Sequence, residues 1–584
     1  MIKIKIEQKV RNSRLLTLAI LCILTVQVSA QEVSPLTRQF ISPVRIVWKT
    51  GAIKDAEQLL KPGNGQADLT NKYKSIFKNV AGGTKAAILL DFGRELQGGL
   101  EIITGMWPGP NKPRKIRIRY GESVSEAMAD IGVKDATNDH AIRDFTALVP
   151  WLGKAQFGES GFRFVRIDLE DEQAELQLKE VRAIFTYRDI PYTGSFKCSD
   201  ERLNKIWQTG AYTVHLNMQE YLWDGIKRDR LVWVGDLHPE ISTVNAVFGY
   251  NDVVPKSLDL SRDMTPLPGW MNGISTYSMW WIILQENWYM HQGNLAYLKE
   301  QQTYLAGLVR QIITKIGDDN QEKLDGTRFL DWPSSENPKG IHAGLQAMTV
   351  WSLTTAARLC HILGDAETEK LAKDAVSRLK SNVPDINGSK QAAALMAIAG
   401  IIPAEQANKD VLSVGGASNF STFYGYYMLQ AKAQAGDYQG ALDVIRQFWG
   451  AMLDLGATTF WEDFNLEWLS NAGRIDELVP NGKKDIHGDY GAYCYLGFRH
   501  SLCHGWASGP TAWLSEHVLG INVLEPGCRV IQINPHLGDL TFAEGTYPTP
   551  QGVLYVKHTK REDGTIKTEI KAPKGVKAIL YQKK

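Results

Sequence analysis

The sequence has almost no net charge, few cysteines and no apolar run long enough to span a membrane comfortably. Lysine and arginine together number 65, against 64 for aspartate and glutamate. The chain therefore lacks the long-range field of a nucleic-acid or acidic-membrane binder. The cysteines after residue 30 are scattered and contain no Cys-x-x-Cys pair, which makes a disulfide framework a poor interpretation. We expect buried thiols, with a Cys494–Cys503 disulfide as the alternative.

The N-terminal segment predicts export. Basic residues precede the apolar run 15–26, and Val28-Ser29-Ala30 offers a small-residue cleavage site before Gln31. The apolar run is short for a membrane helix, and Leu21 is too bulky for a lipidation signal at Cys22. We expect residues 1–30 to be the signal peptide of a soluble periplasmic or secreted protein.

Two parts of the chain alternate apolar and polar residues with the period of half-buried strands. Between about residues 44 and 187 the pattern recurs in short runs such as 115–120 and 162–167. It returns after residue 521, where Asp563-Gly564 is a strong hairpin signal. We predict an N-terminal β-sandwich over residues 31–191 and a small C-terminal β-sandwich over residues 521–584.

Residues 192–520 have helical spacing, most clearly in the apolar series 305, 308, 309, 312, 313 and 316. Gly364-Asp365 and Gly436-Asp437 each end one helix and cap the next, as in antiparallel hairpins. No fixed repeat of 34 or 40 residues is present, which argues against a helical solenoid. Paired helices that bury two faces can instead close into a toroid.

The stretch 223–240, WDGIKRDRLVWVGDLHPE, has the composition of a sugar site. It sets four acidic side chains among arginines and tryptophans. Carboxylic acids transfer protons, arginine holds a neighbouring carboxylate ionised, and an indole face stacks on the C–H surface of a sugar ring. In all, 14 of the 17 tryptophans lie between residues 207 and 513, which suits a helical core or a carbohydrate cleft. The alternative for the stretch is a buried salt-bridge network between helices.

An ordered series of motifs resembles glycoside hydrolase family 78, the α-L-rhamnosidases. The resemblance covers most of residues 85–558 and implies an (α/α)6 toroid between two β-domains, with inverting hydrolysis. The matching segments are LDFG at 90–93, GSFKCSDERLNKIW at 194–207, RDRLVWVGD at 228–236, LDW at 330–332, GATTFWE at 456–462, SLCH at 501–504, PG at 526–527 and GDL at 538–540.

The resemblance also implies residue roles. Asp229 matches the general acid and Glu462 the general base, the two carboxyl groups that an inverting glycosidase places on opposite faces of the sugar. Asp463 and Glu467 are nearby carboxylates that could substitute for Glu462. The residues expected to bind substrate are Asp224, Arg228, Trp233, Asp236, Trp281, Trp332 and His504.

Two features complicate this interpretation. The family's acid is often glutamate, whereas Asp229 is one methylene shorter, so the acid could sit closer, act through water or be impaired. His500 and His504 have the spacing of a metal pair on a helix, but no glutamate or cysteine pattern completes a site. We therefore expect no metal and no cofactor.

The sequence thus predicts an exported, exo-acting α-L-rhamnosidase that takes an oligosaccharide or glycoside, with no nucleic-acid partner and an oligomeric state left open. The alternatives are an inverting exo-glycosidase for another sugar and a carbohydrate-binding protein without catalysis.

Overall fold

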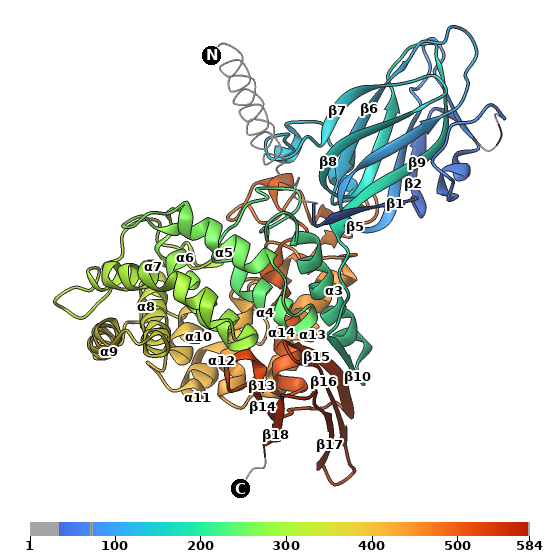
Figure 1. Cartoon of the computed structure of the whole chain (residues 1–584). Coiled ribbons are helices and arrows are strands. Elements are labelled where there is room, and N and C mark those ends of the chain that lie inside the picture. Colours follow the sequence, from blue (N-terminus) through green and yellow to red (C-terminus); the bar gives the residue numbers. More distant parts are fainter. Residues whose placement is uncertain (1–33, 71, 73, 582–584) are drawn as a thin grey trace, which may run out of the picture.

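A computed structural model of the chain describes residues 34–70, 72 and 74–581, so the expected signal peptide lies outside the described residues. Three bodies follow one another along the chain: an N-terminal sheet domain, a helical domain and a smaller pair of sheets (Figure 1). None of the helices in the described ranges combines the length and apolar character that a bilayer crossing requires.

The N-terminal domain is one antiparallel sheet of nine strands around an apolar core. Its centre is the long strand β5, which pairs with β2, β8 and β9 and shifts register where it bends. The strand content expected of the predicted N-terminal β-sandwich is confirmed, and its nine strands are hydrogen-bonded into one continuous sheet. Its strands are β1 (Leu36–Ile41), β2 (Arg45–Thr50), β3 (Ala52–Lys54), β4 (Ser75–Lys78), β5 (Ala87–Thr104), β6 (Arg114–Gly121), β7 (Asp144–Val149), β8 (Lys154–Leu169) and β9 (Glu175–Arg188).

The helical domain is a closed ring. Helix α4 contacts α6, and the contacts continue through α8, α10, α12 and α14 back to α4, with other helices alternating along the chain. The predicted six-hairpin toroid is confirmed. The helices are α3 (Glu201–Asn217), α4 (Leu237–Val247), α5 (Val253–Asp263), α6 (Ser275–Gln292), α7 (Leu295–Ile313), α8 (Pro338–Leu363), α9 (Ala366–Lys380), α10 (Lys390–Ile398), α11 (Ala404–Ala407), α12 (Gly425–Gln434), α13 (Tyr438–Asp454) and α14 (Gly509–Trp513).

The hydrophobic pattern explains which helices form the ring. All eleven residues of α4 are buried, whereas only four of the fifteen in α9 are. An aromatic cluster joins the ring helices: His238 of α4 stacks on Trp280 of α6 and Tyr427 of α12, with Trp351 of α8 packed edge-on against all three. Much of the predicted tryptophan concentration therefore forms core.

The C-terminal part has two sheets, in agreement with the predicted small sandwich. One has the order β10–β15–β16–β17 and the other β13–β14–β18. Strand β10 (Ser195–Cys198) comes from the start of the helical segment and pairs with β15. The other strands are β13 (Ile521–Val523), β14 (Val530–Ile533), β15 (Phe542–Thr549), β16 (Gly552–Lys560), β17 (Ile566–Lys571) and β18 (Lys577–Leu580).

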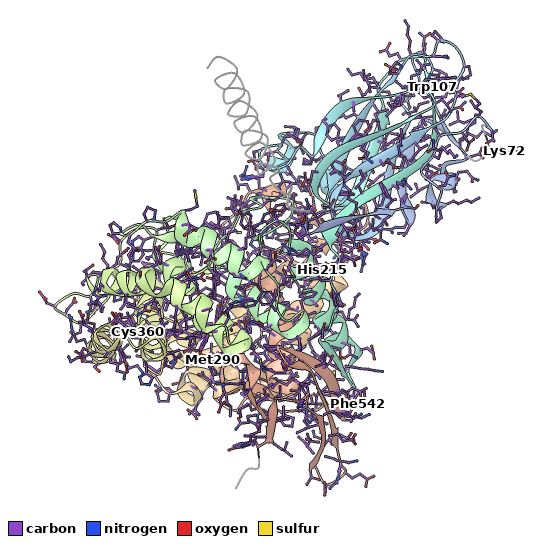
Figure 2. The ribbon with its side chains drawn as sticks, in the orientation of Figure 1. Lys72, Trp107, His215, Met290, Cys360 and Phe542 are labelled. Carbon is purple, nitrogen blue, oxygen red and sulfur yellow. The ribbon has the colours of Figure 1, made fainter. Side chains whose placement is uncertain are left out.

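The N-terminal domain is joined to the helical domain by packing and by buried polar contacts. Its apolar core includes Leu216, Ile226 and Cys503 of the helical part. His215 of α3 bonds through Nε2 to the carbonyl of Arg188, at the end of β9, and Figure 2 shows it where the two bodies meet. Both domains therefore fix the segment that follows α3.

One buried arginine of the N-terminal domain forms a hydrogen bond across this junction and yields a prediction. Arg163 donates from Nε and Nη2 to Asp91 and from Nη1 to the carbonyl oxygen of Gly456. Arg163→Ala leaves the buried Asp91 carboxylate with the half-exposed Arg45 and the N–H of Gly93, and we expect it to lower the free energy of unfolding by about 3 kcal/mol. Denaturant unfolding measures the loss. Lys49→Ala, in the exposed Lys49–Glu57 pair, is the control and should leave the free energy of unfolding almost unchanged. Equal losses would contradict the assignment.

Candidate active site

The candidate site is an open pocket lined by the segments that lead into ring helices α4, α6, α8 and α14. Eight of the nine predicted residues line it: Asp224, Arg228, Asp229, Trp233, Asp236, Trp332, Glu462 and His504.

Arg228 lies between the two predicted catalytic carboxyl groups. Its Nη1 donates to Asp229 Oδ1 over 3.0 Å, and its Nη2 donates to both oxygens of Glu462 over 2.7 and 2.9 Å. Its Nε donates to the carbonyl of Arg499, and its guanidinium lies 3.6 Å from the ring centre of Tyr495. One cation therefore holds both carboxyl groups at the same pocket.

Glu462 is held in the ionised state. Burial alone would raise the pKa of this carboxyl, but the charge of Arg228, with contributions from His504 and His500, lowers its pKa to about 2. The backbone N–H of Ser501 donates to Oε2 over 3.1 Å. An ionised carboxylate that faces a pocket can accept a proton from water.

The backbone around Asp229 is unusual. Asp229 and Arg230 both have positive φ, 56° and 54°, a left-handed conformation that costs side-chain-bearing residues about 1–3 kcal/mol each. Asp224 stabilises this turn, because its Oδ1 accepts from the N–H of Leu231 over 2.9 Å. The turn directs Asp229 to the indole of Trp233, whose Nε1 donates to Oδ2 over 3.0 Å.

Asp236 and His504 form a buried pair on the pocket wall. His504 Nε2 lies 2.9 Å from Asp236 Oδ2, and the Tyr277 hydroxyl donates to Oδ1 over 3.2 Å. Burial would lower the pKa of His504, but Glu462 and Asp236 raise it to about 9. Burial raises the pKa of Asp224 well above its usual range. The wall thus places an imidazole and two carboxyl groups beside a bound ligand.

Trp281 was expected in the pocket, and that prediction is wrong. Its indole is fully buried, donates from Nε1 to the carbonyl of Leu258 on α5, and packs against Tyr304 of α7. Tyr277, one turn earlier on α6, lines the pocket instead. The resemblance that suggested Trp281 did not determine which turn of α6 reaches the opening.

The alternative disulfide is also wrong, because Cys494 and Cys503 are both free, buried thiols. Of the two carboxylates near Glu462, Asp463 is buried and accepts from the Tyr493 hydroxyl, and Glu467 is exposed. The structure brings neither to the pocket lining.

Several pocket residues were missed by the sequence reasoning. They are Ile274, Tyr277, Thr327, Phe329, Tyr495 and Trp506. Trp506 follows two residues after His504 and could have been found by extending that motif. Tyr495 lies in an irregular segment whose path the sequence pattern did not predict.

Two groups of side chains have the spacing of metal ligands. One is Glu462, Cys494 and His500, and the other is Glu122, Glu126 and His487. Each already faces a cation: Arg228 binds Glu462, and Lys227 Nζ lies 3.0 Å from Glu122 and 3.3 Å from Glu126. A metal ion would have to compete with these ammonium or guanidinium groups.

Comparison with known proteins gives two family matches that together span the helical and C-terminal parts. Residues 191–518 match the model of the bacterial alpha-L-rhamnosidase six-hairpin glycosidase domain. Residues 520–582 match that of the bacterial alpha-L-rhamnosidase C-terminal domain. The chain is 23% identical over 542 residues to an alpha-L-rhamnosidase of Alteromonas sp. (strain LOR), covering 84% of this chain and 55% of that protein.

Solved structures share the fold. A family GH78 rhamnosidase of Bacillus sp. GL1 aligns with a TM-score of 0.72 and 22% identity, covering 90% of this chain and 55% of that one. A Klebsiella oxytoca rhamnosidase with rhamnose bound aligns with a TM-score of 0.65 and 20% identity, covering 82% and 96%. The chain thus spans about half the length of the Alteromonas and Bacillus proteins.

The pKa of Glu462 yields a prediction for stability against pH. Because the folded-state pKa is about 2, below the ordinary 4.5, ionised Glu462 stabilises the fold above about pH 4.5. This stabilisation is lost as the pH falls through 2. We expect Glu462→Gln to be less stable than the wild type by about 3 kcal/mol at pH 7, and the difference to shrink towards pH 3.

Thermal unfolding between pH 7 and 3 measures this difference. Glu467→Gln, at the exposed carboxylate five residues away, is the matched control and should follow the wild type. A Glu462→Gln curve that stays parallel to the wild-type curve over the whole range would show that Arg228 does not stabilise ionised Glu462.

Proposed function

The chain belongs to the bacterial alpha-L-rhamnosidase six-hairpin glycosidase family, and we propose that it is an inverting hydrolase that releases terminal α-L-rhamnose from a glycan or glycoside. The observation that carries the proposal is the bridge at Arg228, which holds Asp229 and Glu462 at one pocket. Relatives described as rhamnosidases, one with rhamnose bound, support the choice of sugar.

In the proposed reaction, Asp229 is the general acid. It transfers a proton to the glycosidic oxygen as the bond from that oxygen to the anomeric carbon breaks. Glu462 is the general base and takes a proton from the water whose oxygen bonds to the anomeric carbon from the opposite face. The ionised state of Glu462 supports this role, because only the carboxylate form can accept the proton.

The polar wall supports a role in substrate binding. Asp224, Asp236 and His504 present acceptors and donors for sugar hydroxyl groups, and Arg228 fixes the two carboxyl groups relative to them. Trp233 and Trp332 supply aromatic surface at the lining. We also propose exo action, the mode of cleavage expected from the sequence. The N-terminal segment supports export.

A first experiment tests the sugar and the catalytic pair together. Aryl α-L-rhamnoside should be cleaved, while matched aryl glycosides of other sugars should not. Asp229→Asn and Glu462→Gln should each lower kcat by roughly a hundred- to ten-thousandfold, the range that proton transfer contributes. Glu467→Gln is the control and should keep the wild-type rate.

Each alternative has its own outcome. Release of another sugar would favour a different exo-glycosidase, and binding of rhamnosyl oligosaccharide without release would favour a protein that only binds carbohydrate. Near wild-type rates in both carboxyl variants would contradict the assigned pair.

A second experiment tests the stereochemistry. Proton NMR during the first minutes of hydrolysis should show β-L-rhamnose as the first product, because water attacks from the face opposite the leaving group. α-L-Rhamnose as the first product would instead indicate a retaining reaction with a covalent intermediate.

A further inference from the structure

A histidine of the N-terminal domain reaches the pocket's proposed acid. His140 lies in the segment between α2 (Val124–Met128) and β7, and its Nδ1 is 3.4 Å from Asp229 Oδ1. The carbonyl of His140 accepts from Arg230 Nη2 over 2.9 Å. This contact joins a sheet-domain loop to the left-handed turn that carries Asp229.

We propose that His140 is a positioning residue for Asp229. Its Nδ1 lies 3.4 Å from Oδ1, outside hydrogen-bond geometry, and closes to a hydrogen bond as substrate binds, so that Oδ1 is the acceptor and the transferable proton resides on Oδ2. The inference rests on the proposed function, because it concerns the proton that Asp229 delivers.

The second nitrogen of the ring fixes the direction of this contact. His140 Nε2 lies 3.4 Å from Arg499 Nη2 and 3.7 Å from Asp139 Oδ2, and of these two contacts the one to Arg499 has hydrogen-bond geometry. A guanidinium can only donate, so Nε2 of the neutral imidazole acts as the acceptor and the ring proton is on Nδ1. Asp139 forms an ion pair with Arg499, which keeps that arginine beside the imidazole. The neutral tautomer therefore presents N–H to Asp229.

The two oxygens of Asp229 have different surroundings. Oδ1 accepts from Arg228 Nη1 and lies 3.4 Å from His140 Nδ1, whereas Oδ2 accepts from Trp233 Nε1 and from no other residue in the described part of the chain. An oxygen whose acceptor sites face two donors is a poor place for a proton, so a protonated Asp229 carries it on Oδ2. As the proton leaves, charge grows on the carboxylate and both donors on Oδ1 stabilise it.

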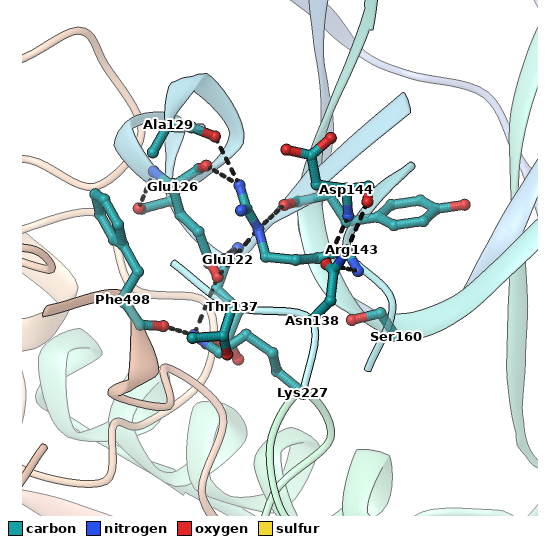
Figure 3. Close-up of polar contacts among 12 residues, drawn as sticks. Glu122, Glu126, Ala129, Thr137, Asn138, Arg143, Asp144, Ser160, Lys227 and Phe498 are labelled. Atoms are coloured by element: carbon teal, nitrogen blue, oxygen red, sulfur yellow. Dashed lines mark hydrogen bonds and ion pairs between the residues drawn. The ribbon is translucent and has the colours of Figure 1, made fainter. Parts of the chain in front are cut away.

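The His140 segment is held by a buried polar network (Figure 3). Arg143 donates from Nη2 to the carbonyls of Glu126 and Ala129 and from Nε to that of Tyr120. Lys227 donates to the carbonyls of Phe498 and His500, and its ammonium pairs with Glu122 and Glu126. The network ties both domains together beside Asp229. A 3.4 Å contact can shorten when substrate binds.

The test separates proton delivery from structural support by varying the leaving group. The 2,4-dinitrophenolate group leaves its α-L-rhamnoside without being protonated. The alkoxide of an alkyl α-L-rhamnoside must be protonated by the general acid as it leaves. His140→Leu should lower kcat/KM on the alkyl rhamnoside by roughly ten- to a hundredfold, the effect of losing one hydrogen bond to a charged group. On the dinitrophenyl rhamnoside it should change kcat/KM by about threefold or less.

A conservative variant and a neighbouring control complete the design. His140→Asn keeps an N–H donor near the place of Nδ1 and should restore most of the rate on the alkyl rhamnoside. Ile142→Ala, at an exposed side chain in the same segment, should match the wild type on both substrates. Thermal unfolding of each variant verifies that the protein is folded.

The outcomes are distinguishable. If the wild type cleaves neither rhamnoside, the proposed function is wrong and this inference falls with it. If the wild type cleaves both, the inference alone is overturned by equal losses on the two substrates, by no loss in His140→Leu, or by a failure of His140→Asn to recover activity.

Discussion

The structure depends on one buried cation that serves two carboxyl groups. Arg228 is almost fully enclosed, and a buried charge is tolerated only when it is well paired. It finds that pairing in Asp229 on one side and Glu462 on the other. The contacts that offset the cost of burying the Arg228 charge also determine where the two carboxyl groups lie. Stability and site geometry therefore depend on the same interactions.

The surrounding fold keeps that arrangement rigid from several directions. The segment after α3 is held by packing against the N-terminal domain, because Leu216 and Ile226 belong to the apolar core of that domain. The segment before α14 supplies Glu462 and His504. It pairs with the segment after α3 through the β-bridge between Gly225 and His504. Segments far apart in sequence thus meet at the pocket because two domains hold them.

Much of this could be predicted from the sequence, for identifiable reasons. The period of the apolar residues distinguished the sheets from the helices, because each side-chain pattern follows directly from backbone geometry. Asp224, Arg228, Asp229, Trp233 and Asp236 were found because they lie in one short stretch. Glu462 and His504 were found because their local motifs resemble those of a known family.

The remainder depends on tertiary placement. Tyr277 and Trp281 are one turn apart on α6, and only the packing of α5 and α7 decides that the tryptophan is core. The position of His140 follows from how the N-terminal domain docks, which no local pattern encodes. The pairing of β10 with β15 likewise joins segments that the sequence pattern had assigned to different domains.

That pairing has a mechanical consequence. Strand β10 immediately precedes α3, and β15 follows α14. The antiparallel pairing of Ser195–Cys198 with Ala543–Thr546 therefore connects the first and last hairpins of the ring. Loss of the distal sheets would strip β10 of its neighbour and leave a bare strand edge at the seam, where foreign strands can add. The C-terminal sheets therefore stabilise the closed ring of helices.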